Sequence, residues 1–290
     1  MTLVDRLLAG ISAGRAVRAI AAAGLAAVLV LAVGPGVAAP QASAAASTVV
    51  VRIGATPVPH AEVLEFIKPI LAKEGVELRI IEFTDYVRPN LALAEGELDA
   101  NYFQHIPYLE TFSKDHRLEL TYIARVHIEP MGLYSRKVKK PEELRRGAII
   151  AIPNDPTNGG RALQLLAQAG LIKLKPDLGL KATVLDITDN PRGLVIRELE
   201  AAQLPRALPD VDGAVINGNY ALEAGLFPVR DAIVLEDVKQ PYISPLANVL
   251  AVRTKDKDSP ALQKVAKALT SEEVKRFLLD RYKGAVLPAF

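Results

Sequence analysis

From Val49 onward the chain alternates short apolar runs with stretches in which apolar residues recur at helical spacing. The run 49–54 predicts a buried strand, and residues 61–74 predict a helix that Gly75 ends. By the same reasoning we expect strands at residues 76–83, 98–103 and 118–126, and helices at residues 86–95 and 107–114. A β-α-β-α-β order of this kind predicts a parallel sheet with helices on its faces.

A second set of units follows the first. Strands are expected at residues 132–135, 148–152, 183–187, 195–199, 214–216, 233–235 and 248–253. Helical segments are expected at residues 141–146, 156–169, 260–269 and 271–282, with Ser259 and Ser271 as N-caps of the last two. The pattern therefore predicts an α/β protein with two mainly parallel sheets flanked by helices.

No Pro/Gly/Ser-rich linker separates the two sets of units, so we expect two lobes joined by short crossings. The crossings are placed near residues 125–130 and 239–245, where Pro130, Pro241 and Pro245 would stiffen the chain. Lobe 1 is then expected at residues 47–129 and 242–290, and lobe 2 at 130–241. Open α/β sheets bind ligands beyond the carboxyl ends of their strands, which predicts a ligand cleft between the lobes.

Residues 1–46 have the composition of a secretory signal that is cleaved. Three arginines precede an apolar run at residues 19–33, which is shorter than the roughly 20 residues that span a bilayer. Ala42 and Ala44 provide a cleavage motif, and Ala46 is an alternative. We therefore expect an exported protein at the periplasmic or extracellular face of the cell membrane.

The charge balance changes once this leader is removed. The leader holds three of the 35 basic and one of the 33 acidic residues, so 32 of each remain and the formal net charge is zero. This balance gives no reason to expect a nucleic acid or an anionic membrane as partner. The chain has no cysteine, so we expect neither disulfides nor lipid attachment through a cysteine after the signal.

The segment Ala151-Ile-Pro-Asn-Asp-Pro-Thr-Asn-Gly-Gly-Arg161 is the most informative motif. A buried strand leads through a turn into a helix N-terminus, where unpaired N–H groups and a partial positive charge favour anions. Gly159 and Gly160 would let a ligand approach the backbone, and the planar guanidinium of Arg161 suits a carboxylate. We expect Arg161 to be solvated when the lobes are apart. The alternative is that the glycines serve packing and Arg161 is a surface charge.

Two further motifs follow predicted strands. Asp99-Ala-Asn-Tyr-Phe-Gln-His-Ile-Pro-Tyr108 concentrates aromatic rings and an imidazole in a chain that is only 5% aromatic, and such walls suit an apolar or thioether side chain. Val215-Ile-Asn-Gly-Asn-Tyr220 ends a strand in amides, which can pair with both polar groups of an amino acid. Ordinary core aromatics and a simple Asn-Gly turn remain the alternatives.

Motifs for phosphate binding or serine-based catalysis are missing from the sequence. His105, His116 and His127 recur every eleven residues, but without a His-x-x-x-His pair they do not predict a metal site. Asp155, Asp186 and Asp189 are expected to be turn or cap residues. We expect no catalytic residues, no metal and no cofactor.

The motifs together resemble those of the methionine-binding proteins of ABC importers, the NlpA/MetQ-type family. The likeness runs from about residue 50 to residue 290 and is strongest in "FTDYVRPNLAL", "LDANYFQHIPYL", "AIPNDPTNGGRALQLLAQAGLIKLK", "ELEAAQLPRAL" and "AVINGNYA". It implies a two-lobed, type II-like periplasmic-binding-protein fold that closes on a free amino acid or short peptide. Two departures stand out: the family's lipid-bearing cysteine is missing, and the segment "KQPYISPLAN" is longer than usual.

The resemblance also implies roles for seven residues. Arg161 would pair with the ligand carboxylate, and Asn217 would hold the polar head together with Asn101. The side chain of the ligand would lie among Tyr86, Phe103, His105 and Tyr108.

We therefore expect a monomeric, non-enzymatic binding protein that takes L-methionine or a similar molecule and delivers it to the membrane permease of an ABC importer. Lobe closure would trap the ligand. The alternatives are an exported enzyme that acts on a small carboxylate on the same fold, and an interaction protein with a vestigial cleft.

Overall fold

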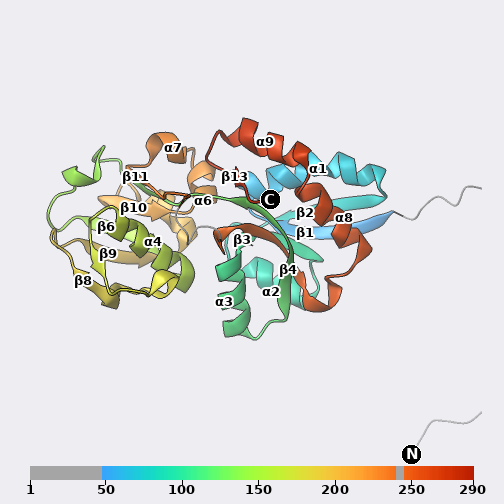
Figure 1. The fold of residues 1–290 in the computed structure, drawn as a ribbon, viewed down its shortest axis with the longest axis horizontal. Coiled ribbons are helices and arrows are strands. Elements are labelled where there is room, and N and C mark those ends of the chain that lie inside the picture. The colour runs from blue at the N-terminus through green and yellow to red at the C-terminus, as the bar shows by residue number, and fades with distance from the viewer. Residues whose placement is uncertain (1–47, 240–244) are drawn as a thin grey trace, which may run out of the picture. The chain divides into compact units, whose positions relative to one another are not determined.

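The computed structural model describes residues 48–239 and 245–290 and contains two mixed β-sheets flanked by helices (Figure 1). We call the six-stranded sheet with its helices lobe 1, and the five-stranded sheet with its helices lobe 2. The expected leader at residues 1–46 lies outside the described residues. So do the boundary at 241/242, Pro241, and part of the segment "KQPYISPLAN".

The strand order in lobe 1 is β13-β4-β12-β3-β1-β2. The strands are β1 (Val49–Ala55), β2 (Val76–Glu82), β3 (Ala100–His105), β4 (Leu120–Ile128), β12 (Asn248–Arg253) and β13 (Leu287–Pro288). The helical segments are η1 (Pro57–Ala61), α1 (Glu62–Lys73), α2 (Arg88–Glu95), α3 (Ile106–His116), η7 (Thr254–Asp256), α8 (Pro260–Leu269) and α9 (Glu272–Tyr282).

The strand order in lobe 2 is β11-β5-β10-β6-β9. These strands are β5 (Gly132–Tyr134), β6 (Ile149–Pro153), β9 (Val195–Leu199), β10 (Gly213–Ile216) and β11 (Val234–Leu235), and β7 (Lys173–Leu174) pairs separately with β8 (Ile187–Asp189). The α-helices are α4 (Pro156–Gln168), α5 (Leu204–Ala207), α6 (Gly218–Glu223) and α7 (Pro228–Asp231). Short 3₁₀ turns are η2 (Pro141–Glu143), η3 (Gly179–Lys181), η4 (Val184–Asp186) and η5 (Ala201–Gln203).

The central strands β3, β12, β6 and β10 are buried on both faces, which explains the apolar runs in the sequence, whereas the edge strands β2 and β9 are partly exposed. Leu250 and Val252 of β12 pack into the core beneath α1, α8 and α9, whereas Val249 and Ala251 pack on the opposite face with α2 and α3. Figure 1 shows these two groups of helices on opposite sides of the sheet. The side chains alternate because successive residues of a strand point to opposite faces.

The two-lobed α/β class is confirmed, but the sheets are mixed rather than mainly parallel. Parallel pairing joins β1 to β2 and β3, and β6 to β9 and β10. Apart from β13 near residue 290, the strands of these two sheets with only antiparallel neighbours are β4, β12, β5 and β11, and these four adjoin the crossings between the lobes. A strand that leads to or from the other lobe is antiparallel to its neighbours. Hydrophobic periodicity does not report the direction of a strand.

Most predicted elements agree with the structure to within two or three residues. The strand expected at residues 183–187 is wrong: Val184–Asp186 forms a 3₁₀ turn, and a strand begins only at Ile187. Ser271 caps α9 by accepting from the N–H of Val274, whereas Ser259 occupies the N-cap of α8 without a side-chain hydrogen bond.

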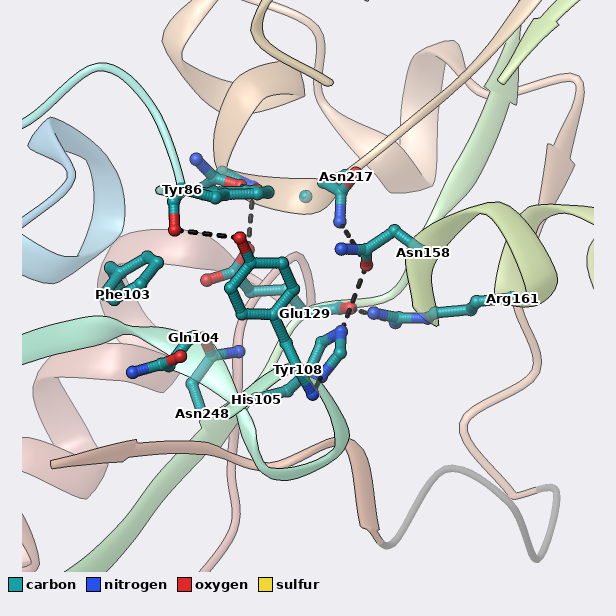
Figure 2. A pocket seen from close by; sticks show the side chains of 12 residues that line it. Tyr86, Phe103, Gln104, His105, Tyr108, Glu129, Asn158, Arg161, Asn217 and Asn248 are labelled. Atoms are coloured by element: carbon teal, nitrogen blue, oxygen red, sulfur yellow. Dashed lines mark hydrogen bonds between the residues drawn. The ribbon is translucent and has the colours of Figure 1, made fainter. Parts of the chain in front are cut away.

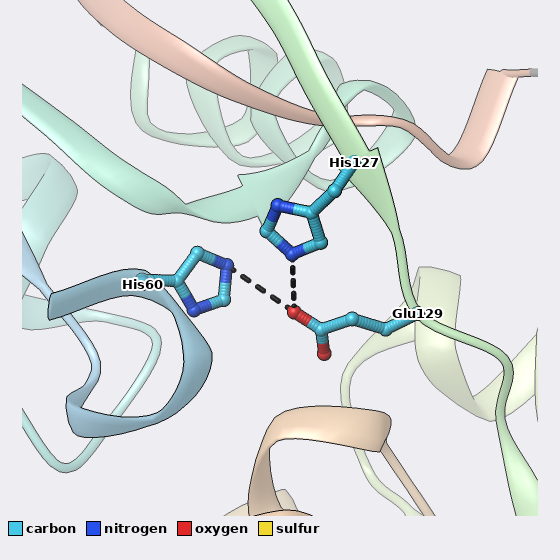
Figure 3. Close-up of side chains that lie close together, drawn as sticks. All are labelled: His60, His127 and Glu129. Atoms are coloured by element: carbon cyan, nitrogen blue, oxygen red, sulfur yellow. Dashed lines mark hydrogen bonds and ion pairs between the residues drawn. The ribbon is translucent and has the colours of Figure 1, made fainter. Parts of the chain in front are cut away.

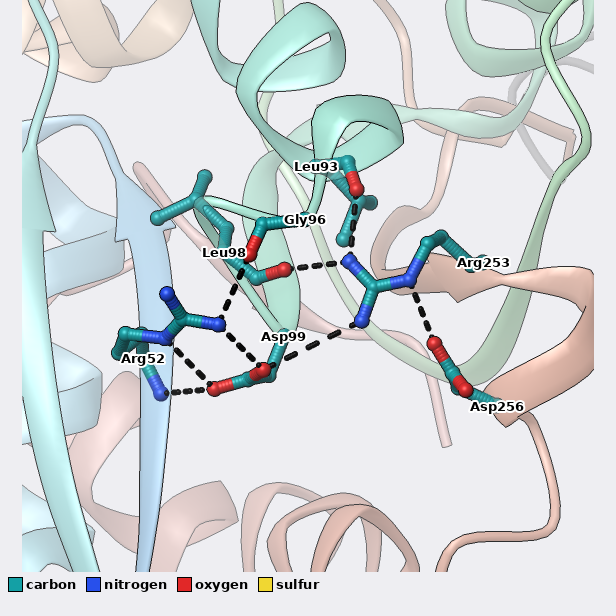
Figure 4. A network of polar contacts seen from close by, with 7 residues as sticks. All are labelled: Arg52, Leu93, Gly96, Leu98, Asp99, Arg253 and Asp256. Atoms are coloured by element: carbon teal, nitrogen blue, oxygen red, sulfur yellow. Dashed lines mark hydrogen bonds and ion pairs between the residues drawn. The ribbon is translucent and has the colours of Figure 1, made fainter. Parts of the chain in front are cut away.

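Two arginines fasten the segment that leads into β3 (Figure 4). The Asp99 carboxylate accepts from the backbone N–H of Arg52 at 2.8 Å and from its Nε and Nη2 at 3.1 and 2.9 Å. Arg253 donates to the carbonyl oxygens of Leu93 and Leu98. Burial raises the pKa of Asp99, but the bonds from Arg52 outweigh it and hold that pKa below its usual value.

We expect Asp99→Ala to lower the free energy of unfolding by about 1–3 kcal/mol, because Arg52 loses its carboxylate partner. Urea unfolding at pH 7 measures the change. The matched control is Glu77→Ala, which removes an exposed pair with Arg79 and should cost less than ~1 kcal/mol. Because the folded-state pKa of Asp99 is depressed, its contribution is complete above about pH 4 and is lost as the pH falls further. Equal losses in the two variants would contradict this role.

Candidate functional site

A small cavity lies where strands of both lobes end. Lobe 1 contributes residues at the end of β3, and lobe 2 contributes residues that follow β6 and β10 (Figure 2). Helix α4 begins directly after β6, and α6 begins directly after β10. The carboxyl ends of the parallel strands therefore place the cavity, as expected for open α/β sheets.

Three aromatic rings from lobe 1 form one wall of the cavity. The ring of Tyr86 lies 5.9 Å from that of Phe103 and 5.7 Å from that of Tyr108, measured between centroids. The hydroxyl of Tyr108 donates to the carbonyl oxygen of Tyr86 at 2.9 Å, which fixes both rings. This wall offers an apolar surface without a charged group.

Amides bridge the two lobes opposite this wall. The side-chain oxygen of Asn158 accepts from His105 Nε2 at 3.0 Å and from Asn217 Nδ2 at 2.8 Å. Asn158 is held in turn by Asp155, the N-cap of α4, whose carboxylate accepts from the amide of Asn158. His105 Nδ1 accepts from the N–H of Tyr108, so its other nitrogen carries the proton. Burial lowers the pKa of His105 to about 3, and the ring is neutral.

Two buried polar atoms at the cavity have no hydrogen-bond partner within the described part of the chain. They are Asn217 Oδ1, an acceptor, and Asn219 Nδ2, a donor. Asn219 Oδ1 is occupied, because it accepts from the hydroxyl of Tyr86 at 2.5 Å. Buried polar atoms are normally satisfied, so this pair indicates a ligand with both donors and acceptors.

Arg161 lines the cavity and also ties together the two crossings between the lobes. Its Nε and Nη2 donate to the carboxylate of Glu236 at 2.9 and 2.5 Å, and Nη2 also donates to the carbonyl oxygen of Glu129 at 2.7 Å. Glu129 follows β4 and Glu236 follows β11, so each belongs to one crossing. Both members of the ion pair are almost completely buried. Arg161 is therefore not the surface charge that the alternative interpretation expected, because Glu236 and the crossings enclose it; its solvation when the lobes are apart stays a prediction.

The glycines of the first motif serve packing rather than ligand approach. A Cβ at Gly160 would lie 2.1 Å from the carbonyl oxygen of Leu180, and one at Gly159 would lie 3.0 Å from that of Pro153. Gly218 does border the cavity, and a Cβ there would lie 2.7 Å from the Cβ of Glu129. The missing side chain thus lets the start of α6 approach Glu129.

His60, His127 and Glu129 lie together behind the cavity (Figure 3). Glu129 Oε1 is 2.7 Å from His127 Nε2 and 3.3 Å from His60 Nε2, and Asn248 Oδ1 is 3.1 Å from the same His60 nitrogen. The potential ligand atoms lie within 4.8 Å of one another, close enough to consider a metal ion. However, both Nε2 atoms face acceptor oxygens at hydrogen-bonding distance, so we interpret the group as a hydrogen-bond network. His105 and His116 do not belong to it.

Six of the seven predicted site residues line the cavity: Tyr86, Phe103, His105, Tyr108, Arg161 and Asn217. Asn101 does not, because its side chain donates to Asn90 and to the carbonyl oxygen of Pro89 and accepts from Gln104 behind the wall. Their roles toward a ligand stay predictions.

Sequence reasoning missed other residues that line the cavity. They are Gln104, Glu129, Asn158, Asn219 and Asn248. Gln104, Asn158 and Asn219 lie inside the quoted motifs. The sequence pointed to these segments but did not show which of their amide side chains would line the cavity. Glu129 immediately precedes Pro130 at a predicted crossing, and that position was the available signal.

No helix among the described residues is long and apolar enough to cross a membrane. Comparison with known proteins gives consistent matches along the chain. The family model for NlpA lipoprotein matches residues 51–290. The D-methionine-binding lipoprotein MetQ of Escherichia coli strain K12 is 46% identical over 204 residues, which are 70% of this chain and 74% of that protein.

Two solved structures have similar folds. The nutrient binding protein from Burkholderia cenocepacia bound to methionine is 48% identical, with a TM-score of 0.79, over 83% of this chain and all of that chain. The periplasmic substrate-binding protein of an ABC transporter from Coxiella burnetii is 44% identical, with a TM-score of 0.78, over 82% of this chain and all of that one. Relatives are named lipoproteins, so the comparisons do not support the expectation of a protein without a lipid, although the 290 residues contain no cysteine. Motifs, fold and matched length agree, and the chain belongs to the NlpA lipoprotein family.

Proposed function

We propose that this protein is the extracytoplasmic solute-binding component of an ABC importer and that it binds methionine or a closely related amino acid in the cavity between its lobes. The observation that carries the proposal is the division of one small cavity into an aromatic wall and a polar end with unsatisfied amides. In this arrangement of the lobes the cavity has room for about one water molecule, so a ligand would enter when the lobes part.

The aromatic wall suits the side chain of the ligand. Tyr86, Phe103 and Tyr108 present ring faces and edges, and a thioether makes favourable contacts with aromatic rings. A charged side chain placed there would lose its hydration without gaining an ion-pair partner.

The polar end suits an α-amino acid head group. Asn219 Nδ2 can donate to the ligand carboxylate, and the positive charge of Arg161 attracts it. Asn217 Oδ1 and the Glu129 carboxylate can accept from the ammonium group. Because these residues come from lobe 2 and a crossing while the aromatic rings come from lobe 1, the ligand would bridge the lobes and favour their closure.

The resemblance to the bound relative and the names of the others support a binding protein that works with a permease. An enzyme on this fold would need an acid–base pair that reaches the ligand. His105 and Glu129 both line the cavity, but both nitrogens of the His105 ring are hydrogen-bonded, to the N–H of Tyr108 and to Asn158. Mass spectrometry of methionine after incubation with the protein should return unaltered methionine.

We expect methionine to bind at least about 100-fold more tightly than glutamate or lysine, because a charged side chain is not compensated at the aromatic wall. Isothermal titration calorimetry against both enantiomers of methionine, norleucine, glutamate, lysine and methionyl dipeptides measures this preference. Tighter binding of glutamate or lysine than of methionine would refute the proposed ligand class.

The ion pair between Arg161 and Glu236 allows a second test. Because removal of Arg161 alone would weaken both folding and ligand binding, the two effects have to be separated. We expect Arg161→Ala to lower the free energy of unfolding by about 3–5 kcal/mol, because the buried Glu236 loses its partner. Arg161→Gln combined with Glu236→Gln removes both charges and keeps hydrogen-bonding groups, so it should fold. This double variant should bind methionine at least about 100-fold more weakly than the parent. Thermal melts with and without methionine separate the two effects, and undiminished stabilisation by methionine would show that Arg161 is purely structural.

A further inference from the structure

The carboxylate of Glu129 lies close to N–H groups from three different elements, and two of them donate hydrogen bonds to it. Oε1 accepts from His127 Nε2 at 2.7 Å and lies 3.3 Å from His60 Nε2, and Oε2 accepts from the backbone N–H of Asn219 at 2.7 Å. An ionised carboxylate accepts hydrogen bonds and donates none, so this environment favours the charged form. Burial acts in the opposite direction and outweighs these contacts, so the pKa of Glu129 lies above its usual value and a cation beside it would favour the charged form.

Hydroxyl groups fix which nitrogen of each histidine carries the proton. Tyr102 Oη is hydrogen-bonded to His127 Nδ1, and Thr56 Oγ1 lies 2.7 Å from His60 Nδ1. Because each Nε2 faces acceptor oxygens, the proton belongs on Nε2 and the hydroxyl donates to Nδ1. Burial lowers the pKa of His60 to about 4 and that of His127 to about 3, so both rings are neutral donors near pH 7.

The neutral rings leave the negative charge of Glu129 without a cation of its own. Among the ion pairs of the described residues, Glu129 is matched only with the two histidines, whereas Arg161 is paired with Glu236. Glu129 nevertheless borders the cavity. Its charge is therefore available to a positively charged group that enters the cavity.

We propose that His127 and His60 are positioning residues that orient the Glu129 carboxylate toward the ammonium group of the ligand, with Tyr102 and Thr56 holding the imidazoles in the required tautomer. This inference rests on the proposed function, since it assigns the ammonium as the group that Glu129 binds. It makes the network behind the cavity a determinant of specificity for free amino acids over carboxylic acids that lack the amino group.

A comparison of two ligands separates this role from a structural one. The probes are methionine and 4-(methylthio)butanoate, which has the same side chain and carboxylate but no ammonium group. His127→Leu removes the donor, His127→Gln keeps an N–H at similar reach, and His116→Leu alters an exposed histidine outside the network as the control. Calorimetry gives the dissociation constant of each variant for each probe, and circular dichroism and thermal melts verify folding.

We expect His127→Leu to weaken methionine binding about 10- to 100-fold, the size of a hydrogen bond to a charged group, and to change binding of 4-(methylthio)butanoate less than about threefold. His127→Gln should restore most of the difference, and His116→Leu should behave like the parent. Tyr102→Phe, which removes a single hydroxyl, should show the same ligand dependence in weaker form. It serves as the test if His127→Leu does not fold.

The pH profile provides an independent readout. The charged or titratable groups that face Glu129 are His60, His127, Arg161, Tyr86 and Tyr102, from five different segments. Loss of the His127 donor raises the pKa of Glu129, so in His127→Leu the decline of methionine affinity on acidification should begin at higher pH than in the parent.

Equal weakening of both probes in His127→Leu, or an unchanged preference for methionine, would overturn the positioning role while leaving the proposed function intact. If instead the parent protein binds no amino acid of the panel, the proposed function itself fails. Stoichiometric Zn²⁺ binding that is lost in His127→Leu would also overturn the inference, because a metal would then occupy both Nε2 atoms.

Discussion

The buried ion pair between Arg161 and Glu236 is the interaction on which the organisation of the site depends. Arg161 extends from α4, Glu236 lies in one crossing, and the carbonyl oxygen of Glu129 in the other crossing accepts from the same guanidinium. The N–H of Met131 also donates to Glu236, so the crossings are linked directly. A pair of this kind is costly to bury unless hydrogen bonds satisfy it, and backbone groups of Glu129 and Met131 supply two of these bonds.

This arrangement gives the same residues a part in folding and in recognition. The amide of Asn158 joins the lobes through His105 and also borders the cavity, as does Asn217, which bonds to Asn158. Glu129 connects α6 to the histidines and borders the same cavity. Substitutions at the site will therefore change stability and affinity together unless the partner is changed as well. Five neutral amides border the cavity together with one basic and one acidic side chain, a set that would suit the zwitterionic ligand proposed above.

Hydrophobic periodicity located the secondary-structure elements well where both faces of a strand are buried. Strands such as β6 and β12 are continuous apolar runs, and helices such as α4 carry clear caps and stops, so periodicity locates them. It failed at residues 183–187, where the apolar residues belong to a short 3₁₀ turn, and it could not report strand direction next to the crossings. The motifs at strand ends, together with the family resemblance, named six residues that line the cavity. It could not identify Glu236 as the partner of Arg161, since 75 positions separate them, nor the convergence of His60 and His127 on Glu129, because such pairings are set by tertiary packing.

The position of β12 has a consequence for how the chain acquires its structure. β12 lies between β3 and β4 in the six-stranded sheet, although it is contributed by residues 248–253, more than a hundred residues later in the sequence. During synthesis all strands of the five-stranded sheet are complete before this central strand emerges. Until then β3 and β4 each lack a neighbour and expose an unsatisfied edge. Such long-range pairing slows folding, so the first lobe in sequence is the last to become a finished unit.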